Sequence, residues 1–241
     1  WSRYAEFGWL GMPATEHAGG LNASVDDIAI LCEEMGRGLA QDSFIGGAIL
    51  PLQVLQHCRE SERSLDHVTH LIAGKTRVAL AAYEPDRRYS LYPGARITPA
   101  GSDRFKLSGH KTLVLGGASA DQLIVSATLD ANPVLALVEA HSDGVRGRRY
   151  ETLDGMPVAD FLFEDAVLHR EGLLKSGDTA LLIIEDALDQ ASLYLCAEAL
   201  GCMDKAVELT ASYLKLRKQF GKTLAEFQVL QHAVAEMAID A

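Results

Sequence analysis

The chain has 241 residues and a formal net charge of −11 at pH 7. Its length suffices for one large domain or for about two or three small ones. Because phosphate groups would repel an acidic protein, the charge argues against a general nucleic-acid binder and against a protein that lies on a membrane surface.

Two further features bear on the compartment. No run of about 18 apolar residues occurs and no signal peptide opens the sequence, so we expect no membrane insertion. The cysteines show no CxxC or CxxH spacing, and each lies in a segment that reads as an apolar helix face. We expect buried thiols rather than disulfides or metal ligands, and hence a reducing, cytoplasmic location without a metal site. The four cysteines are Cys32, Cys58, Cys196 and Cys202.

The first third of the chain is predicted to be helical. Residues 24–40 begin with Ser24 as an N-cap and continue with apolar residues at spacings of three and four. Residues 44–58 and 61–75 repeat this helical pattern, and Gly74 provides a C-terminal stop. We expect an N-terminal helical domain over residues 1–75.

From Arg77 the pattern changes to short β-branched or alternating runs, divided by Gly, Pro, Asn and Asp. The connections between these runs are too short to hold a helix, so hairpins are expected. We predict a middle domain over residues 76–176, built as a mainly antiparallel sheet or barrel. The expected strands lie within residues 77–85, 104–115, 121–129, 133–140 and 158–169.

The last third is predicted to be a helical hairpin. Residues 178–218 contain no proline and only Gly201 as a breaker, so they read as one long helix, which Gly221 stops. Residues 224–241 continue as an antiparallel partner helix. We expect part of a helical bundle over residues 177–241, and hence an α+β fold in the order helical, β, helical. The sequence opens at Trp1 and its last helical pattern is still running at Ala241, so we expect it to be incomplete at both ends.

The turn between the last two helices carries the sequence RKQFG. Its two cations, Arg217 and Lys218, lie near a helix C-terminus, where positive charge is favourable, and Gly221 is free to take a positive φ. One interpretation is a solvated helix cap, and the other is a receptor for a phosphate from a ligand or a neighbouring subunit. Gln228 and Gln231 follow beside the apolar stripe of the next helix.

Residues 213–237, YLKLRKQFGKTLAEFQVLQHAVAEM, resemble the R-x-x-F-G…F-Q…Q…A-x-M signature of the acyl-CoA dehydrogenase family. The resemblance continues along the chain in family order, through FGWLGMPATEHAGG near the start, RVALAAYEP at the first strand and FKLSGHKTLVLGGASAD in the middle domain. The long helix is most similar to the small subunits of pimeloyl-CoA-type dehydrogenases. The family has the same order of helical, β and helical domains.

The resemblance implies a flavoprotein oxidoreductase of fatty acid metabolism that binds FAD. In the family, the R-x-x-F-G turn reaches the FAD of an adjoining subunit, so a homo- or hetero-oligomer, either a dimer or a tetramer, is implied. Arg217 would contact the diphosphate, Gln219 and Phe220 would line the adenosine side, and Gln228 would support the same cofactor. The implied substrate is an acyl-CoA, and the implied electron acceptor is of the electron-transfer flavoprotein type.

Two departures from the family pattern affect the cofactor site. The family has a Gly/Ser-rich turn with Ser-Asp after its E-P pair, whereas this chain has DRRYSLYPG; Arg87 and Arg88 are either replacements for a CoA phosphate or solvated side chains. The family often has Trp-Ile-Thr where this chain has Leu-Val-Leu, so the threonine hydroxyl is lost. The backbone N–H groups of Leu115 and Gly116 still offer donors to the flavin.

No catalytic base can be assigned. The reaction requires a carboxylate to remove the α-proton of the thioester and a flavin N5 to accept the β-hydride. In most of the family this glutamate lies beyond the position of Ala241, and the alternative position on the long helix corresponds here to Ala191 and Ser192. Two hypotheses result: an FAD-dependent acyl-CoA dehydrogenase that desaturates its substrate at the α,β bond, or a non-catalytic subunit that shares an FAD site with a catalytic partner. The acids on the same helix read as its solvated face: Glu185, Asp186, Asp189 and Glu198.

Overall fold

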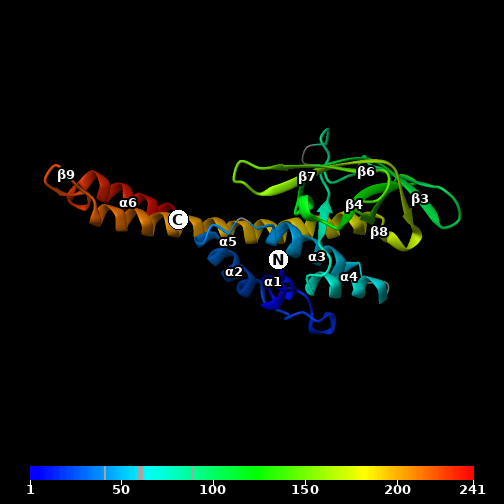
Figure 1. Cartoon of the computed structure of the whole chain (residues 1–241), viewed down its shortest axis with the longest axis horizontal. Helices are drawn as coiled ribbons and strands as arrows, with labels where there is room; N and C mark the ends of the chain where they lie inside the picture. Colours follow the sequence, from blue (N-terminus) through cyan, green and yellow to red (C-terminus); the bar gives the residue numbers. More distant parts are fainter. Residues whose placement is uncertain (41, 59–61, 88–89) are drawn as a thin grey trace. The chain divides into compact units, whose positions relative to one another are not determined.

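The computed structural model describes residues 1–40, 42–58, 62–87 and 90–241. It has helices at the start, an eight-stranded sheet in the middle and helices at the end (Figure 1). The predicted fold class is therefore confirmed. The described residues divide into two compact units, one of residues 1–24 and 41–191 and the other of residues 25–40 and 192–241.

The first unit contains short helical elements that accompany the sheet. A π-helical turn, η3, runs directly into α3, and Gly46 and Gly47 lie within it. A Cβ at Gly46 would lie 2.5 Å from the Cβ of Leu115, so the glycine allows the end of strand β3 to approach the turn closely. The helical elements are α1 (Ser2–Glu6), η1 (Trp9–Gly11), η2 (Glu16–Ala18), η3 (Ile45–Ile49), α3 (Leu50–His57), α4 (Glu62–Ile72) and the part of α5 up to residue 191.

The sheet has the strand order β6-β7-β3-β2-β4-β5-β8, and β1 pairs with β4 outside this path. Its ladders are antiparallel except that β4 is parallel to both β1 and β2. The mainly antiparallel sheet agrees with the prediction from short connections. The strands are β1 (Val78–Ala81), β2 (Arg96–Pro99), β3 (Arg104–Leu115), β4 (Gln122–Leu129), β5 (Asn132–Glu139), β6 (Val145–Glu151), β7 (Pro157–His169) and β8 (Leu173–Ser176).

Three strands of the sheet lie where the sequence pattern gave no strand, namely β2, β6 and β8, and β6 is the longest of them. Residues 145–151 form β6, which pairs with β7 at the edge of the sheet. The sequence there is VRGRRYE, which lacks the apolar alternation of a half-buried strand. An edge strand can carry such charged residues because it has only one neighbour.

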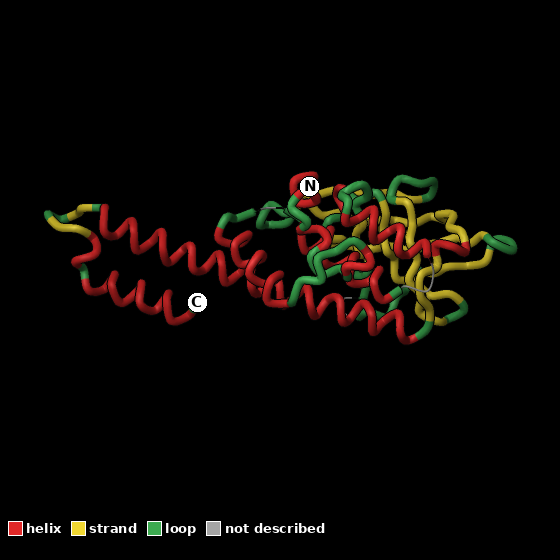
Figure 2. The backbone as a smooth tube through the Cα atoms, turned by 90° about the horizontal axis from the view of Figure 1, so that it is seen from below, coloured by secondary structure: helices red, strands yellow, loops and turns green. Residues whose placement is uncertain are grey.

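The second unit is built from α2 (Val25–Arg37), the later part of α5 (Asp178–Leu216) and α6 (Gln228–Asp240). Helices α2 and α5 approach each other at two glycines: a Cβ at Gly36 or at Gly201 would lie 1.9 Å from a backbone oxygen of the opposite helix. Cys202 Sγ also donates to the carbonyl oxygen of Gly36 at 3.2 Å. Beyond α5 the chain reverses, and α6 runs back alongside it (Figure 2).

The expectation of four buried thiols was wrong in part. Cys32 and Cys58 are buried, Cys202 is partly exposed and Cys196 is exposed. Tyr194, two residues earlier on α5, is buried beside Cys32. A helix turns about 100° per residue, so Cys196 points away from the face that α2 covers.

Candidate functional site

The turn that follows β3 has a conformation that requires glycine. Gly116 is buried and has a φ of +74°, and it begins the short helical turn η4 (Gly117–Ser119) without a side-chain cap. A Cβ at Gly116 would lie 3.0 Å from the Cα of Gly47. The predicted flavin-contacting residues, Leu115 and Gly116, therefore belong to a tight turn whose polar groups are those of the backbone.

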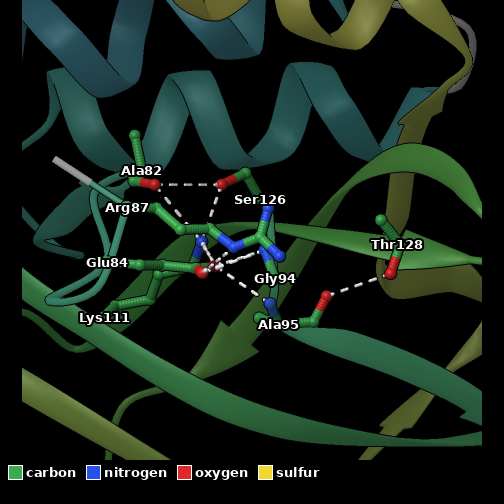
Figure 3. A network of polar contacts seen from close by, with 8 residues as sticks. All are labelled: Ala82, Glu84, Arg87, Gly94, Ala95, Lys111, Ser126 and Thr128. Atoms are coloured by element: carbon green, nitrogen blue, oxygen red, sulfur yellow. Dashed lines mark hydrogen bonds and ion pairs between the residues drawn. The ribbon is translucent and has the colours of Figure 1, made fainter. Parts of the chain in front are cut away.

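A buried lysine lies five residues before Gly116. Lys111 is fully buried, and its Nζ donates to Glu84 Oε1 at 2.7 Å, to Ser126 Oγ at 2.9 Å and to the carbonyl oxygen of Ala82 at 3.2 Å (Figure 3). Ser126 Oγ in turn donates to the same Ala82 oxygen. Burial lowers the pKa of Lys111 to about 8, although the hydrogen bond and the charge of Glu84 act in the opposite direction.

Glu84 closes the loop in which the family has its Ser-Asp turn. Its carboxylate accepts the backbone N–H groups of Gly94 and Ala95 at 2.9 Å, in addition to the bond from Lys111 (Figure 3). Burial alone would raise the pKa of Glu84, but these hydrogen bonds and the lysine charge outweigh it, so the pKa lies below its ordinary value. The loop is therefore tied at both ends by one ionised carboxylate.

Arg87 and Arg88 of this loop are the predicted alternatives for contacting a CoA phosphate. Arg88 lies outside the described residues. Arg87 Nε lies 3.7 Å from Glu84 Oε2, and the arginine side chain is about half exposed. Arg87 also lines an open groove of about 390 Å³ together with Tyr92, Arg96 and Asp130. Whether it contacts a CoA phosphate stays a prediction.

The RKQFG segment forms a β-hairpin with a two-residue turn. Strands β9 (Lys218–Gln219) and β10 (Lys222–Thr223) pair across Phe220 and Gly221, whose φ angles are 54° and 83°. Positive φ at both central residues is typical of a type I′ turn, in which an asparagine or glycine is normal at the first position. Phenylalanine there is strained, and its side chain is 89% exposed.

Local contacts fix this hairpin. Thr223 and Glu226 form a capping box at the start of η6 (Leu224–Glu226). Lys222 Nζ lies 4.2 Å from the centroid of the Phe227 ring, and the rings of Phe220 and Phe227 meet edge to face at 6.2 Å. The turn is therefore ordered by its own side chains, although its tip is exposed.

Arg217, the residue predicted to contact the FAD diphosphate, is exposed. Within the described part of the chain, the Arg217 guanidinium takes part in no ion pair or hydrogen bond, and the same is true of the Gln219 and Gln228 amides. All three residues and Phe220 are exposed. The structure thus gathers the RKQFG residues at one hairpin in the second unit, whereas Leu115 and Gly116 belong to the first unit.

The long helix does not reveal a base. Ala191 is buried and Ser192 is exposed, and neither carries a carboxylate. Glu185, Asp186 and Asp189 are exposed, as expected for a solvated helix face. Among the described residues there is no cluster of His, Cys, Asp or Glu that could hold a metal ion, and no helix is long and apolar enough to cross a membrane.

Asp160 is a polar residue of the site region that the sequence analysis did not single out. It is buried in β7, where it accepts hydrogen bonds from Thr112 and Leu113 of β3. The available signal was a single acid inside the apolar run VADFLF, since an unpaired carboxylate is rarely buried.

Comparison with known proteins gives matches to one family. Residues 181–241 match the family described as acyl-CoA dehydrogenase, C-terminal domain. The chain is 29% identical over 255 residues to the long-chain specific acyl-CoA dehydrogenase of Sus scrofa mitochondria, covering 98% of this chain and 58% of that protein. These matches confirm the resemblance to the acyl-CoA dehydrogenase family.

Solved structures with a similar fold are found as well. The chain is 30% identical to the Tcur3481-Tcur3483 steroid ACAD, with a TM-score of 0.80 over 99% of this chain and 63% of that one. A glutaryl-CoA dehydrogenase from Mycobacterium smegmatis in complex with FADH2 has the same fold, with 22% identity and a TM-score of 0.89 over 99% of this chain and 62% of that one. The chain spans 58% to 65% of the length of the curated relatives that it matches.

Proposed function

We propose that the chain is part of an FAD-dependent acyl-CoA dehydrogenase that desaturates an acyl-CoA thioester at its α,β bond. The observation that carries the proposal is the Arg217 guanidinium, which is exposed without a protein partner beside a strained, locally fixed hairpin. Backbone strain is retained in proteins mainly where a function requires it. A planar guanidinium suits a diphosphate because its donors match two phosphate oxygens at once.

The residues present fit FAD at two places. At the hairpin, Arg217 would hold the diphosphate, Gln219 and Phe220 would line the adenosine side, and Gln228 would add an amide. At the turn after β3, the backbone N–H groups of Leu115 and Gly116 would face the flavin, as the family resemblance implies. When bound, FAD supplies a flavin N5 that accepts a hydride.

The exposure of the hairpin supports an oligomer in which it completes the cofactor site of an adjoining subunit. Phe220 at the turn tip is 89% exposed, so its ring is free to be covered by a ligand or a partner. We propose a dimer or tetramer in the cytoplasm that passes electrons to an acceptor of the electron-transfer flavoprotein type. The proposal rests on the family resemblance for the acceptor and the acyl-CoA substrate.

The second candidate function is a subunit that shares FAD but takes its catalytic base from a partner. The observation in its favour is that Ala191 and Ser192 occupy the alternative base position and that the neighbouring acids are solvated. A similar solved protein, the Tcur3481-Tcur3483 steroid ACAD, bears a name of two components. Both candidates require the same FAD site.

The first experiment is the visible absorbance of the purified protein after incubation with FAD and desalting, together with its oligomeric mass. A flavin band retained on a dimer or tetramer supports the proposal, and a colourless oligomer contradicts it. Bleaching of the band by an acyl-CoA under anaerobic conditions favours the dehydrogenase. A flavin that is retained but not bleached favours the base-lacking subunit.

A pair of variants tests the role of Arg217. Arg217→Ala should weaken FAD retention by about tenfold or more, because a hydrogen bond to a charged group contributes about 1.5 to 3 kcal/mol. Lys215→Ala is the matched control, since it removes one exposed positive charge from the last turn of α5. Equal retention in the two variants would exclude Arg217 as the diphosphate ligand.

A further inference from the structure

Strand β3 contains a bulge directly before the turn at Gly116. Lys111 pairs with Phe161 and Val114 pairs with Ala159, so two residues of β3 lie opposite one residue of β7. The two are Thr112 and Leu113, and the one is Asp160. A bulge of this kind interrupts the ladder and leaves backbone groups in need of other partners.

The Asp160 carboxylate supplies those partners. Its Oδ1 accepts the Leu113 N–H at 3.0 Å and the Thr112 hydroxyl at 2.8 Å. The neighbouring strand β6 adds the Tyr150 hydroxyl to Oδ1 at 2.8 Å and Arg148 Nη2 to Oδ2 at 3.0 Å. One side chain therefore joins three strands of the sheet at the bulge.

The ionised state of the Asp160 carboxylate favours the hydrogen bonds that it accepts. Burial would raise the pKa of Asp160, but the hydrogen bonds from Leu113, Thr112, Tyr150 and Arg148 outweigh it, so the carboxylate is ionised at neutral pH. Burial and Asp160 raise the pKa of Tyr150, which keeps its hydroxyl a proton donor. His110 and Arg146 line the same open cavity as Arg148 and Asp160, and Arg146 pairs with Glu164.

The bulge decides which side chains of β3 face inward. In a regular strand successive side chains alternate, so Lys111 and Val114 would point to opposite faces. Both are buried here, with exposed fractions of 0% and 1%, because the extra residue shifts the alternation. The same shift sets the position at which Leu115 and Gly116 leave the sheet.

The backbone of the bulge is strained, and hydrogen bonds hold it in this conformation. Leu113 has a φ of 51°, in the left-handed region that a leucine rarely adopts. The bond from its N–H to Asp160 and the bond from the Thr112 N–H to the carbonyl oxygen of Tyr83 hold the two residues in place. The Leu113 side chain is left 44% exposed at the surface.

We propose that Asp160 is a positioning residue for the cofactor: by fixing the bulge at Thr112 and Leu113, it places the backbone donors of Leu115 and Gly116 toward the flavin. This inference rests on the proposed function for the presence of FAD. Asp160 itself acts on the strand and does not contact the cofactor. The family often has a threonine hydroxyl at the position of Leu115. In this chain, Asp160 would instead hold the backbone in position to donate.

The test compares Asp160→Asn with Asp165→Asn in the full-length protein. Asp165 is a suitable control because it lies on the same strand, has a φ of 54° and accepts bonds from Lys106 and Ser108, but is exposed. Backbone hydrogen exchange is measured by mass spectrometry without FAD, over peptides covering residues 110–120. We expect exchange there to accelerate about tenfold in Asp160→Asn, as for loss of one hydrogen bond to a charged group, and to stay unchanged in Asp165→Asn.

The second readout is the bound flavin. In Asp160→Asn we expect FAD to dissociate about tenfold more readily and the visible circular dichroism of the remaining flavin to change, since its donors have moved. Adding Leu113→Gly to this variant should restore part of the retention, because glycine adopts the positive φ without strain. If Asp160 only stabilised the fold, its substitution would leave the dichroism of the bound flavin unchanged, and Leu113→Gly would not restore FAD retention.

The outcomes separate the inference from the proposed function. If the unaltered protein holds no flavin, the proposed function fails. If it holds flavin and Asp160→Asn shows unchanged exchange, retention and dichroism, the inference is overturned. Should Asp160→Asn not fold, Tyr150→Phe takes its place, because it removes one donor to Asp160; unchanged exchange over residues 110–120 would then overturn the inference.

Discussion

Lys111→Met is the substitution for which the structure gives the clearest expectation. It removes a fully buried ammonium group that makes three hydrogen bonds, while the methionine keeps most of the volume of the side chain. The variant leaves the Glu84 carboxylate, which is only 10% exposed, without its buried cation, so that its remaining ion pair is with the half-exposed Arg87 at 3.7 Å. Breaking a buried ion pair by removing one partner typically costs about 3 to 5 kcal/mol.

The magnitude should fall at the lower end of this range. Glu84 keeps the N–H donors of Gly94 and Ala95, and Ser126 keeps its bond to the carbonyl oxygen of Ala82. We therefore expect the free energy of unfolding to fall by about 3 kcal/mol. The control is Lys106→Met, which breaks the pair with Asp165 at a similar distance of 2.9 Å, but with side chains 44% and 65% exposed. That variant should lose at most about 1 kcal/mol.

The assay is equilibrium urea unfolding followed by circular dichroism at pH 7. A double variant, Lys111→Met with Glu84→Gln, removes both members of the buried pair, so its loss should be smaller than the sum of the two single losses by about 1 kcal/mol or more. A Lys111→Met protein no less stable than Lys106→Met would refute the reasoning. So would a double variant whose loss equals the sum.

Three further predictions concern stability and pH. Gly116→Ala should destabilise the protein by about 2 kcal/mol in urea unfolding and Gly177→Ala by about 1 kcal/mol, because both have positive φ but only Gly116 has neighbours within 4 Å; equal losses would contradict this. Gly201→Ala should cost about 3 kcal/mol and separate α2 from α5, whereas Gly38→Ala, with its nearest neighbour at 3.5 Å, should cost less than about 0.5 kcal/mol. Asp160 has a pKa below its ordinary 3.8, so its stabilising contribution is complete above that pH and is lost as the pH falls through the folded-state value. The acid loss of stability should therefore be shallower in Asp160→Asn than in the unaltered protein, and identical acid titrations would contradict the assignment.

The helices and most strands were predictable because their information is local. Apolar spacing located the helix over residues 178–218 to within two residues of α5, which ends at Leu216. Gly221 was expected to take a positive φ and does, at 83°. In contrast, β6 carries arginines where a half-buried strand would alternate, so its pairing with β7 was not visible in its own residues.

The polar centres of the site were not predictable, because they depend on distant residues. The buried Lys111 ammonium is paired with Glu84, 27 residues earlier, and bonds to Ala82 and Ser126. The bulge at Leu113 depends on Asp160, 47 residues later. A lysine or an aspartate in an alternating strand reads as solvent-facing, and only the three-dimensional register shows that it points inward. The roles of the RKQFG residues remain predictions that rest on the resemblance and on their exposure.

The departures from the family pattern lie close to two carboxylates, the partly buried Glu84 and the buried Asp160. The loop without Ser-Asp is closed by Glu84, and the strand without the threonine hydroxyl is shaped by Asp160. A lost side-chain donor can be replaced by a backbone donor only if the backbone is held at the right place, since an N–H group cannot rotate toward its acceptor as a hydroxyl can. Neither carboxylate depends on the catalytic base. The proposed FAD contacts therefore do not require the base in this chain, and they are compatible with a subunit whose partner provides it.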